Sequence, residues 1–166
     1  MTRESGETEQ ADGPDVSNGL EITRVDSYGE LPQWLSREQL GRFLHESLKP
    51  YEDPYPVVLE GLDYALGDDP CGGGFVLLGR SGSRLLGAVV MLETRMQRYV
   101  PENLLLFIAV EPDARGRGIG GSLIGRVFEE CEGQVKLHVE HDNPARRLYE
   151  RCGFKSKYLE MRWTRE

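Results

Sequence analysis

The sequence predicts a single mixed α/β domain, and three observations carry this prediction. The chain has 166 residues, the usual size of one compact domain with its own hydrophobic core. Apolar residues recur at helical spacing in the first part of the chain, whereas the short apolar or alternating runs typical of strands begin after residue 74. Turn-forming residues at 70–74 separate the two patterns, and helical patterns then alternate with strands toward the end.

Composition excludes several classes of protein. There are 28 acidic and 20 basic side chains, a formal net charge of -8, so the chain lacks the basic surface that nucleic-acid binding needs. No apolar run approaches the ~20 residues that span a bilayer, and the first residues lack the layout of a secretory signal. We therefore expect a cytoplasmic protein with no nucleic-acid or membrane partner. Three widely spaced cysteines without a CxxC motif predict neither a disulfide framework nor a metal site.

Residues 1–19 are predicted to be an acidic disordered tail, and residues 20–166 the folded domain. The tail holds five acidic side chains, one arginine and only three apolar residues, too few to offset the entropy of ordering. It carries half of the net charge, so the domain itself is only mildly acidic.

The elements before residue 70 follow from local patterns. Alternation over residues 21–26 predicts an edge strand. Ser36 and Gln39 have the spacing of a capping box, which begins a helix. Prolines after residue 49 end that helix, and a second helical pattern follows them. The apolar residues of the two helices are Leu40, Phe43, Leu44 and Leu48, then Val58, Leu62, Ala65 and Leu66.

After residue 74 the period changes to that of strands. Two runs joined by a Ser-Gly-Ser turn predict a hairpin, and a third run is apolar throughout, as in a strand covered on both faces. Asn143 followed by Pro144 predicts the start of a short helix, which Gly153 closes. The expected order is strands at 75–78, 85–92 and 104–110, a helix at 122–132, a strand at 135–139, the short helix, and a final strand at 158–164.

The most informative segment is residues 107–123, where an apolar strand passes Pro112 and enters a glycine-rich loop before a helix. Four glycines in this loop leave backbone N–H groups unobstructed at the helix start, where the helix dipole favours an anion. Arg115 and Arg117 flank the same loop and supply donors for charge-assisted contacts. A tight turn needs fewer glycines, so the loop predicts phosphate or pyrophosphate binding.

Residues 116–121 also fit the pattern GxGxxG, with Glu140 at a suitable distance for a dinucleotide-binding unit. Two features argue against that interpretation. Residues 111–115 separate the strand from the first glycine, and too few residues follow Glu140 to build the remaining strands. No Lys-Ser/Thr follows the glycines, which excludes a Walker-type loop.

A second motif runs from Asn143 to Phe154, and with the loop it resembles the GCN5-related N-acetyltransferase (GNAT) family. The family's loop, Arg/Gln-x-x-Gly-x-Gly/Ala, is met by Arg115, Gly118 and Gly120. Its later signature, Asn-x-x-Ala-x-x-Leu-Tyr-Glu-x-x-Gly-Phe, is nearly reproduced, with Ala145 one place early. The order of elements agrees too, so the resemblance covers residues 20–166.

This resemblance implies an acyl-CoA N-acyltransferase fold, an α/β fold whose mixed central sheet has two splayed parallel strands and is flanked by helices. Acetyl-CoA would lie in the splay, as a co-substrate without a metal. Asn143 would contact it from the far side while also capping its helix. The other implied cofactor-binding residues are Ile108, Ala109 and Val110 at the pantetheine and Arg115, Gly116, Arg117, Gly118, Ile119, Gly120 and Gly121 at the pyrophosphate.

The implied activity is transfer of an acetyl group to a primary amine by direct attack in a ternary complex. Tyr149 matches the family's general acid, which protonates the departing thiolate. His138 is the favoured base, with Glu140, Glu93, Glu111 or a water chain as alternatives. Cys131 and Cys152 lie where nothing activates a thiolate, which argues against an acetyl-cysteine intermediate.

The acceptor is expected to be a small molecule or a peptide, selected by residues 36–66 and 95–103. Tyr51, Glu52, Asp53 and Tyr55 offer acidic and aromatic groups for a cationic amine. Two competing interpretations stay open: a catalytically silent CoA-binding regulatory module, which needs neither Tyr149 nor a base, and an NAD-binding oxidoreductase. The final strand could serve as the edge of a homodimer or as a monomer's edge.

Overall fold

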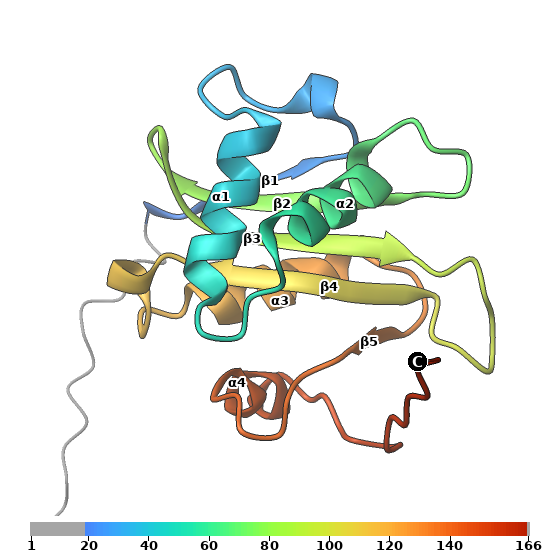
Figure 1. Cartoon of the computed structure of the whole chain (residues 1–166). Coiled ribbons are helices and arrows are strands. Elements are labelled where there is room, and N and C mark those ends of the chain that lie inside the picture. The colour runs from blue at the N-terminus through green and yellow to red at the C-terminus, as the bar shows by residue number, and fades with distance from the viewer. Residues whose placement is uncertain (1–18, 166) are drawn as a thin grey trace, which may run out of the picture.

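A five-stranded sheet with helices on both faces forms the body of the protein in the computed structural model, which describes residues 19–165 (Figure 1). The strand order is β1-β2-β3-β4-β5, antiparallel throughout except for the parallel pair β4–β5. A single parallel pair does not fit the doubly wound sheet of a dinucleotide-binding unit, and that interpretation is wrong. The predicted acidic tail lies outside the described residues, apart from Gly19. The strands are β1 (Glu21–Val25), β2 (Gly74–Ser81), β3 (Arg84–Glu93), β4 (Asn103–Val110) and β5 (Val135–Leu137).

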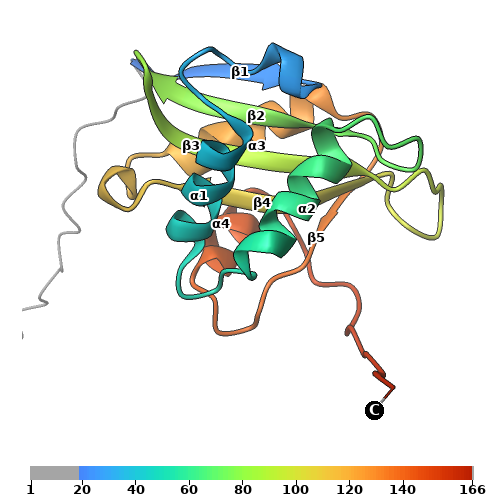
Figure 2. The same cartoon turned by 45° about the horizontal axis from the view of Figure 1, so that its top comes forward.

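Helices cover the two faces of the sheet unequally. Two helices, α1 (Arg37–Leu48) and α2 (Tyr55–Leu66), pack on one face, and α3 (Ile119–Glu130) packs on the other (Figure 2). The short helix α4 (Ala145–Arg151) lies beyond β5, on the far side of the splay from β4 (Figure 1). Two 3-10 turns, η2 (Tyr28–Glu30) and η3 (Pro112–Ala114), complete the elements. No helix among the described residues is long and apolar enough to cross a membrane.

The two-layer core explains the continuous apolar runs of the central strands. In β2, Val76 and Leu78 pack toward α1 and α2, whereas Phe75 and Leu77 pack toward α3. Because both faces are covered, every position of such a strand is apolar. Two-sided burial is predicted for residues 104–110; in β4, Phe107 and Ala109 are buried toward α1 and α2, whereas Ile108 and Val110 are only partly buried on the α3 face.

Local signals identified the start of α1, the β2–β3 turn and the end of α4. The Ser36 hydroxyl accepts the N–H of Gln39 at 3.2 Å, and the Ser36 N–H donates to the Gln39 side chain at 2.7 Å, which is the predicted capping box. Gly82 has a φ of 60° in the β2–β3 turn. Gly153, with a φ of 96°, closes α4 as expected.

The predicted final strand at 158–164 is wrong. In the structure this segment follows α4 without forming a strand, and its large apolar side chains are exposed. A strand needs a partner edge, and β5 ends at Leu137, two residues earlier than the predicted 135–139 strand. α3 begins at Ile119, three residues before the predicted start, because left-handed Gly118 forms its N-cap.

The parallel strands separate after a short pairing. β4 and β5 pair only from Asn103↔Val135 to Leu105↔Leu137, whereas β4 continues beside β3 as far as Val110↔Gly87. Within residues 19–165, the carboxyl-terminal part of β4 therefore has a strand partner on one side only. This divergence of the two strands forms the expected splay (Figure 1).

Candidate active site

Backbone groups of β4 line the splay at alternate residues. The Glu111 N–H donates to the Leu86 carbonyl on β3 at 2.8 Å, so by alternation the groups of Ala109 also face β3. Those of Ile108 and Val110 face the opposite side, toward the splay. Of the three residues expected to present backbone groups here, two do so and Ala109 does not.

The glycine-rich loop presents unobstructed N–H groups at the same end of β4. Gly116 and Gly118 have φ values of 74° and 80°, a region that L side chains rarely adopt. A Cβ at Gly116, Gly118 or Gly121 would meet nothing within 4 Å. The first N–H groups of α3 have no partner within the helix. Together they form a cradle that fits a pyrophosphate.

Gly120 holds α3 close to α4. A Cβ at this position would lie 2.8 Å from a methyl group of Leu148, so a larger residue would require the Leu148 side chain to move. This close approach brings the start of α3 beside the helix that carries Tyr149.

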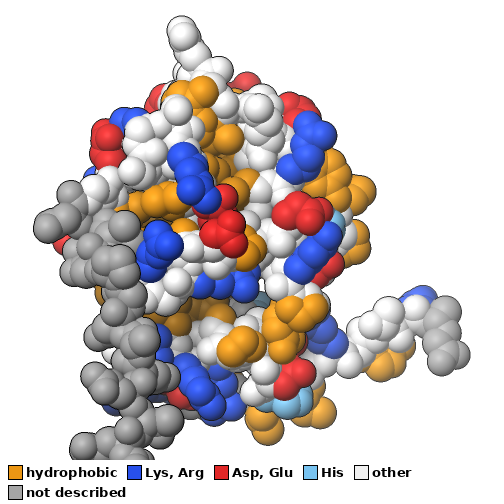
Figure 3. Space-filling view, turned by 90° about the vertical axis from the view of Figure 1, so that its left-hand side faces the viewer, with side chains coloured by type: hydrophobic (Ala, Val, Ile, Leu, Met, Phe, Trp, Pro, Cys, Tyr) orange, Lys and Arg blue, Asp and Glu red, His pale blue; other side chains and the backbone are white. Residues whose placement is uncertain are grey.

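Arg115 connects the loop to α1. Its Nη2 donates to the Ser47 carbonyl at 2.6 Å, and its Nε donates to the Val110 carbonyl at 3.3 Å. The carbonyl end of a helix attracts a cation, which explains this orientation. Arg115 and Arg117 are both exposed. Figure 3 shows basic side chains spread over this side of the molecule, with acidic ones between them.

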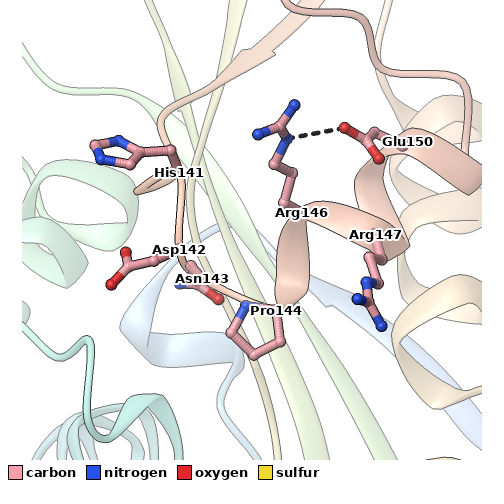
Figure 4. A pocket seen from close by; sticks show the side chains of 7 residues that line it. All are labelled: His141, Asp142, Asn143, Pro144, Arg146, Arg147 and Glu150. Carbon is pink, nitrogen blue, oxygen red and sulfur yellow. Dashed lines mark hydrogen bonds and ion pairs between the residues drawn. The ribbon is translucent and has the colours of Figure 1, made fainter.

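A cavity of about 400 Å³ lies at the start of α4 (Figure 4). Asn143 lines it, and its side-chain oxygen accepts the Ala145 N–H at 2.9 Å, although Pro144 and not Asn143 is the N-cap of α4. Arg146 and Arg147, which the sequence reasoning missed, also line it; the signal was a pair of arginines directly after the Asn-Pro helix start. Arg146 pairs with Glu150 at 2.8 Å, and Arg147 points away from that pair (Figure 4).

The α1–α2 loop reaches this cavity. The Tyr51 hydroxyl donates to the Asp142 carbonyl at 3.2 Å. The loop predicted to select the acceptor therefore touches the segment between β5 and α4, next to Asn143.

Tyr149 is buried in α4, with 8% of its surface exposed. Its ring packs edge-on against Phe154 at a centroid distance of 6.0 Å. No hydrogen-bond partner for its hydroxyl is found within residues 19–165. Burial, and then the negative charge of Glu140, raise the pKa of Tyr149 to about 12. The hydroxyl therefore stays protonated at neutral pH.

The candidate bases differ in their surroundings. Glu140 lies close enough for its charge to act on the Tyr149 pKa. His138 is half-exposed, and its Nε2 lies 3.8 Å from a carboxylate oxygen of Glu160. Glu111 is paired with Arg84 at 2.7 Å. Glu93 lies opposite Asn103 in the register of β3 and β4, at the end of β4 that is remote from the glycine-rich loop, so the structure does not bring Glu93 to the site.

Neither cysteine chemistry nor a metal is indicated by the described side chains. Burial raises the pKa of Cys131, which disfavours its thiolate. Within residues 19–165, no group of three His, Cys, Asp or Glu side chains is placed to hold a metal ion.

A splayed mixed sheet with a glycine-rich helix start at its open end defines the fold of the GNAT acetyltransferases. Residues 72–156 match the sequence profile of the "Acetyltransferase (GNAT) domain". The chain belongs to this family.

Solved structures agree with this assignment of the fold. The aminoglycoside N-acetyltransferase AAC(6')-Iy in complex with CoA superposes with a TM-score of 0.63 at 15% identity, over 88% of this chain and 94% of that one. The ribosomal-protein-alanine N-acetyltransferase from Brucella melitensis biovar Abortus 2308 gives 0.62 at 18% identity, over 87% and 98%. At these identities the likeness shows the fold alone.

One curated relative shares a shorter stretch. The cysteine-rich protein 2-binding protein of Mus musculus is 39% identical over 57 residues, which are 34% of this chain and 7% of that protein. The chain thus matches only a small part of that relative's length.

Proposed function

We propose that this protein is an acetyl-CoA-dependent N-acetyltransferase that acetylates a primary amine by direct attack in a ternary complex. The observation that carries the proposal is the coincidence of two features at one end of β4. The backbone groups of Ile108 and the N–H of Val110 face the splay without a strand partner, while the Val110 carbonyl accepts Arg115 Nε; the open N–H groups of residues 116–121 lie directly beyond them.

These features match the chemistry of acetyl-CoA, which supplies an activated acetyl thioester on an amide-containing arm and a pyrophosphate. Ile108 and Val110 would hydrogen-bond the arm as a neighbouring strand would. The first turn of α3 would bind the pyrophosphate with its N–H groups, and Arg117 would add a positive charge. Arg147, at the start of α4, offers a further cation beside Asn143.

In the proposed reaction the amine nitrogen attacks the acetyl carbon. A C–N bond forms, the C–S bond breaks, and the sulfur leaves with the electron pair and takes up, through the base and water, the proton that the amine nitrogen gives up. The Tyr149 hydroxyl would donate a hydrogen bond to the sulfur as charge develops there. With a pKa of about 12, the Tyr149 phenol is a weaker acid than a thiol, whose pKa is about 8.5. We therefore assign Tyr149 the role of stabilising the charge on the sulfur by a hydrogen bond until the sulfur is protonated.

The amine must lose a proton before it attacks, and we propose Glu140 as the group that receives it, directly or through water. It is the candidate base whose charge reaches Tyr149. His138 stays as the second candidate, because it directly follows β5 on the other side of the splay.

The acceptor would enter beside the α1–α2 loop. The Tyr51 hydroxyl donates a hydrogen bond to the Asp142 carbonyl there, and Glu52 and Asp53 follow Tyr51 in the sequence. Acidic and aromatic groups favour a cationic amine, on a small molecule or on a peptide. Of the two solved structures named above, one is an aminoglycoside N-acetyltransferase and the other a ribosomal-protein-alanine N-acetyltransferase, which is one acceptor of each kind.

The proposal is tested by calorimetric titration with acetyl-CoA, followed by free-thiol release across amines, polyamines, amino acids and peptides. Tyr149→Phe should bind acetyl-CoA normally and lose at least about tenfold in turnover, which corresponds to ~1.4 kcal/mol of transition-state stabilisation. Tyr158→Phe, at a site 77% exposed and outside the segments expected to select the acceptor, is the matched control and should keep full turnover. Acetyl-CoA binding without thiol release over a broad panel would favour the silent binding module instead.

A further inference from the structure

Tyr149 is held by the packing of its ring. The side chain is buried, and its hydroxyl makes no hydrogen bond to any residue in the described range 19–165. The first side-chain torsion places the hydroxyl oxygen, and the second sets the plane of the ring, in which a phenol O–H bond prefers to lie. This second torsion is intrinsically broad in tyrosine. A neighbour that fixes the ring plane therefore also fixes the direction in which the hydroxyl donates.

Phe154 is the aromatic neighbour of this ring. The two ring centroids are 6.0 Å apart and the ring planes are inclined by 70°, which is the edge-to-face arrangement that aromatic pairs favour. Rotation of the Tyr149 ring about its own axis would disrupt this arrangement. The contact therefore restricts the torsion that sets the ring plane.

The end of α4 places Phe154 against Tyr149. The Phe154 N–H donates to the Tyr149 carbonyl at 3.0 Å, and the Gly153 N–H donates to the Glu150 carbonyl at 3.1 Å. With Gly153 at a φ of 96°, these bonds form a Schellman motif. A hydrophobic contact between residues in the positions of Tyr149 and Phe154 frequently accompanies this motif. The local helix ending thus accounts for the pair, but not for a third ring that packs against it.

The third ring is that of Phe128, near the end of α3. Its centroid lies 5.7 Å from that of Phe154, with the planes inclined by 40°. At the other end of α3, Leu148 lies against Gly120. α4 and its ending therefore contact α3 at two points, one in its first turn and one in its last turns. Since α3 begins at the glycine-rich cradle, these contacts relate Tyr149 to the cradle through one helix.

We propose that Phe154, held in place by Phe128, is a positioning residue that directs the Tyr149 hydroxyl toward the sulfur of acetyl-CoA. This inference rests on the proposed function. The first turn of α3 would hold the pyrophosphate, and Phe128 near the end of the same helix would hold the ring that orients Tyr149. The arm that joins the pyrophosphate to the sulfur has a limited length, so fixing both groups to α3 determines how the sulfur and the hydroxyl meet.

The kinetic test is a double-mutant cycle. Phe154→Leu should lower kcat at least about fivefold and change the Kd of acetyl-CoA by less than about twofold, because a misdirected hydroxyl weakens contacts of the transition state. In a Tyr149→Phe background the same change should alter kcat by less than about twofold, since no hydroxyl is left to orient. An equal factor in both backgrounds would show a merely structural role and would overturn the proposal.

Two matched variants separate the ring of Phe154 from general packing. Phe154→Tyr keeps an aromatic ring and should retain kcat, so a loss as large as that of Phe154→Leu overturns the proposal. Phe75→Leu removes a buried ring elsewhere in the core on the α3 face. It should lower the melting temperature and leave kcat unchanged. A fall in kcat as large as that of Phe154→Leu would show that any lost ring has this effect, which also overturns the proposal.

Nuclear magnetic resonance with ring-labelled tyrosine gives a readout that needs no acceptor. The Tyr149 signal is identified by its loss in Tyr149→Phe. In the wild type it should move when acetyl-CoA is added, whereas in Phe154→Leu it should lie nearer the position of free tyrosine and respond less at equal occupancy. Equal positions and responses in the two proteins overturn the positioning role alone. Acetyl-CoA binding without a response in the wild type overturns the role of Tyr149 in the proposed function, and this proposal with it.

Discussion

At Tyr149, burial and the charge of Glu140 act in the same direction, and both keep the phenol protonated. A group whose pKa is raised by folding stabilises the protein fully below its unfolded pKa, near 10, and loses that contribution as pH rises toward 12. The reason is that only the unfolded tyrosine ionises in this window, so unfolding releases a proton.

This predicts that Tyr149→Phe flattens the alkaline loss of stability. Between pH 9.5 and 11.5 the wild type should lose about 2 kcal/mol more of its unfolding free energy than the variant. Urea unfolding at both pH values provides the measurement. Tyr28, whose pKa is raised by burial and by Asp63, titrates in both proteins and so cancels. Parallel curves would mean that Tyr149 is not perturbed.

The two arginines of the glycine-rich loop should have separable effects. Arg115→Met removes the bond to the Ser47 carbonyl and should lower stability by about 1 kcal/mol. Arg117→Met should leave stability unchanged but weaken acetyl-CoA binding by about tenfold, ~1.4 kcal/mol. Chemical denaturation and calorimetry distinguish the two. The binding defect of Arg117→Met should shrink in high salt, since it reflects the loss of an exposed charge. Equal losses of stability in both variants would contradict the assignment of a structural role to Arg115 and a binding role to Arg117.

At the scale of elements, the start of α3 depends on a backbone conformation. Gly118→Ala forces a side chain into a left-handed residue and should cost about 1–2 kcal/mol. Gly125→Ala is the matched change inside the same helix, where a Cβ meets open space, and should stabilise by about 0.5–1 kcal/mol. Thermal unfolding should show shifts of opposite sign. Acetyl-CoA affinity should fall only for Gly118→Ala, and a fall in both would contradict a role specific to the cradle.

Elements defined within a turn or two were predictable from the sequence, and those that depend on distant partners were not. The Ser36–Gln39 capping box needs only residues three apart. The segment 158–164 has a strand's alternation, yet no pattern within it reports whether a partner edge is within reach.

The same limit applies within the site. The family resemblance implied that Ile108, Ala109 and Val110 all present backbone groups to the splay, but only the register with β3 shows which of them face it. The partner of Arg115 lies 68 residues away at Ser47, so no local pattern reveals it. The open glycine loop was predictable because its residues are contiguous.

At the scale of the whole molecule, the described core is built from residue 20 onward. Removing residues 1–18 should therefore change the melting temperature by less than about 2 °C, as expected for a loss of well under 1 kcal/mol. Removal of residues 1–18 also halves the net negative charge, so the truncated protein should bind the anionic acetyl-CoA more tightly than the full chain at low salt. In 0.5 M salt, where charges are screened beyond about 4–5 Å, the two proteins should bind it equally. A large drop in melting temperature would show that the tail packs on the fold.

The brevity of the β4–β5 pairing has a consequence for the motions of the protein. Only three residue pairs join β5 to the rest of the sheet, whereas β2 and β3 pair along their whole lengths. Segments held by few hydrogen bonds open at lower free energy than the core. Amide hydrogens from residue 135 onward should thus exchange faster than those of β2 and β3. A ligand that bridges β4 and α4 would slow that exchange most, because it would take the place of the strand hydrogen bonds that β4 and β5 do not make.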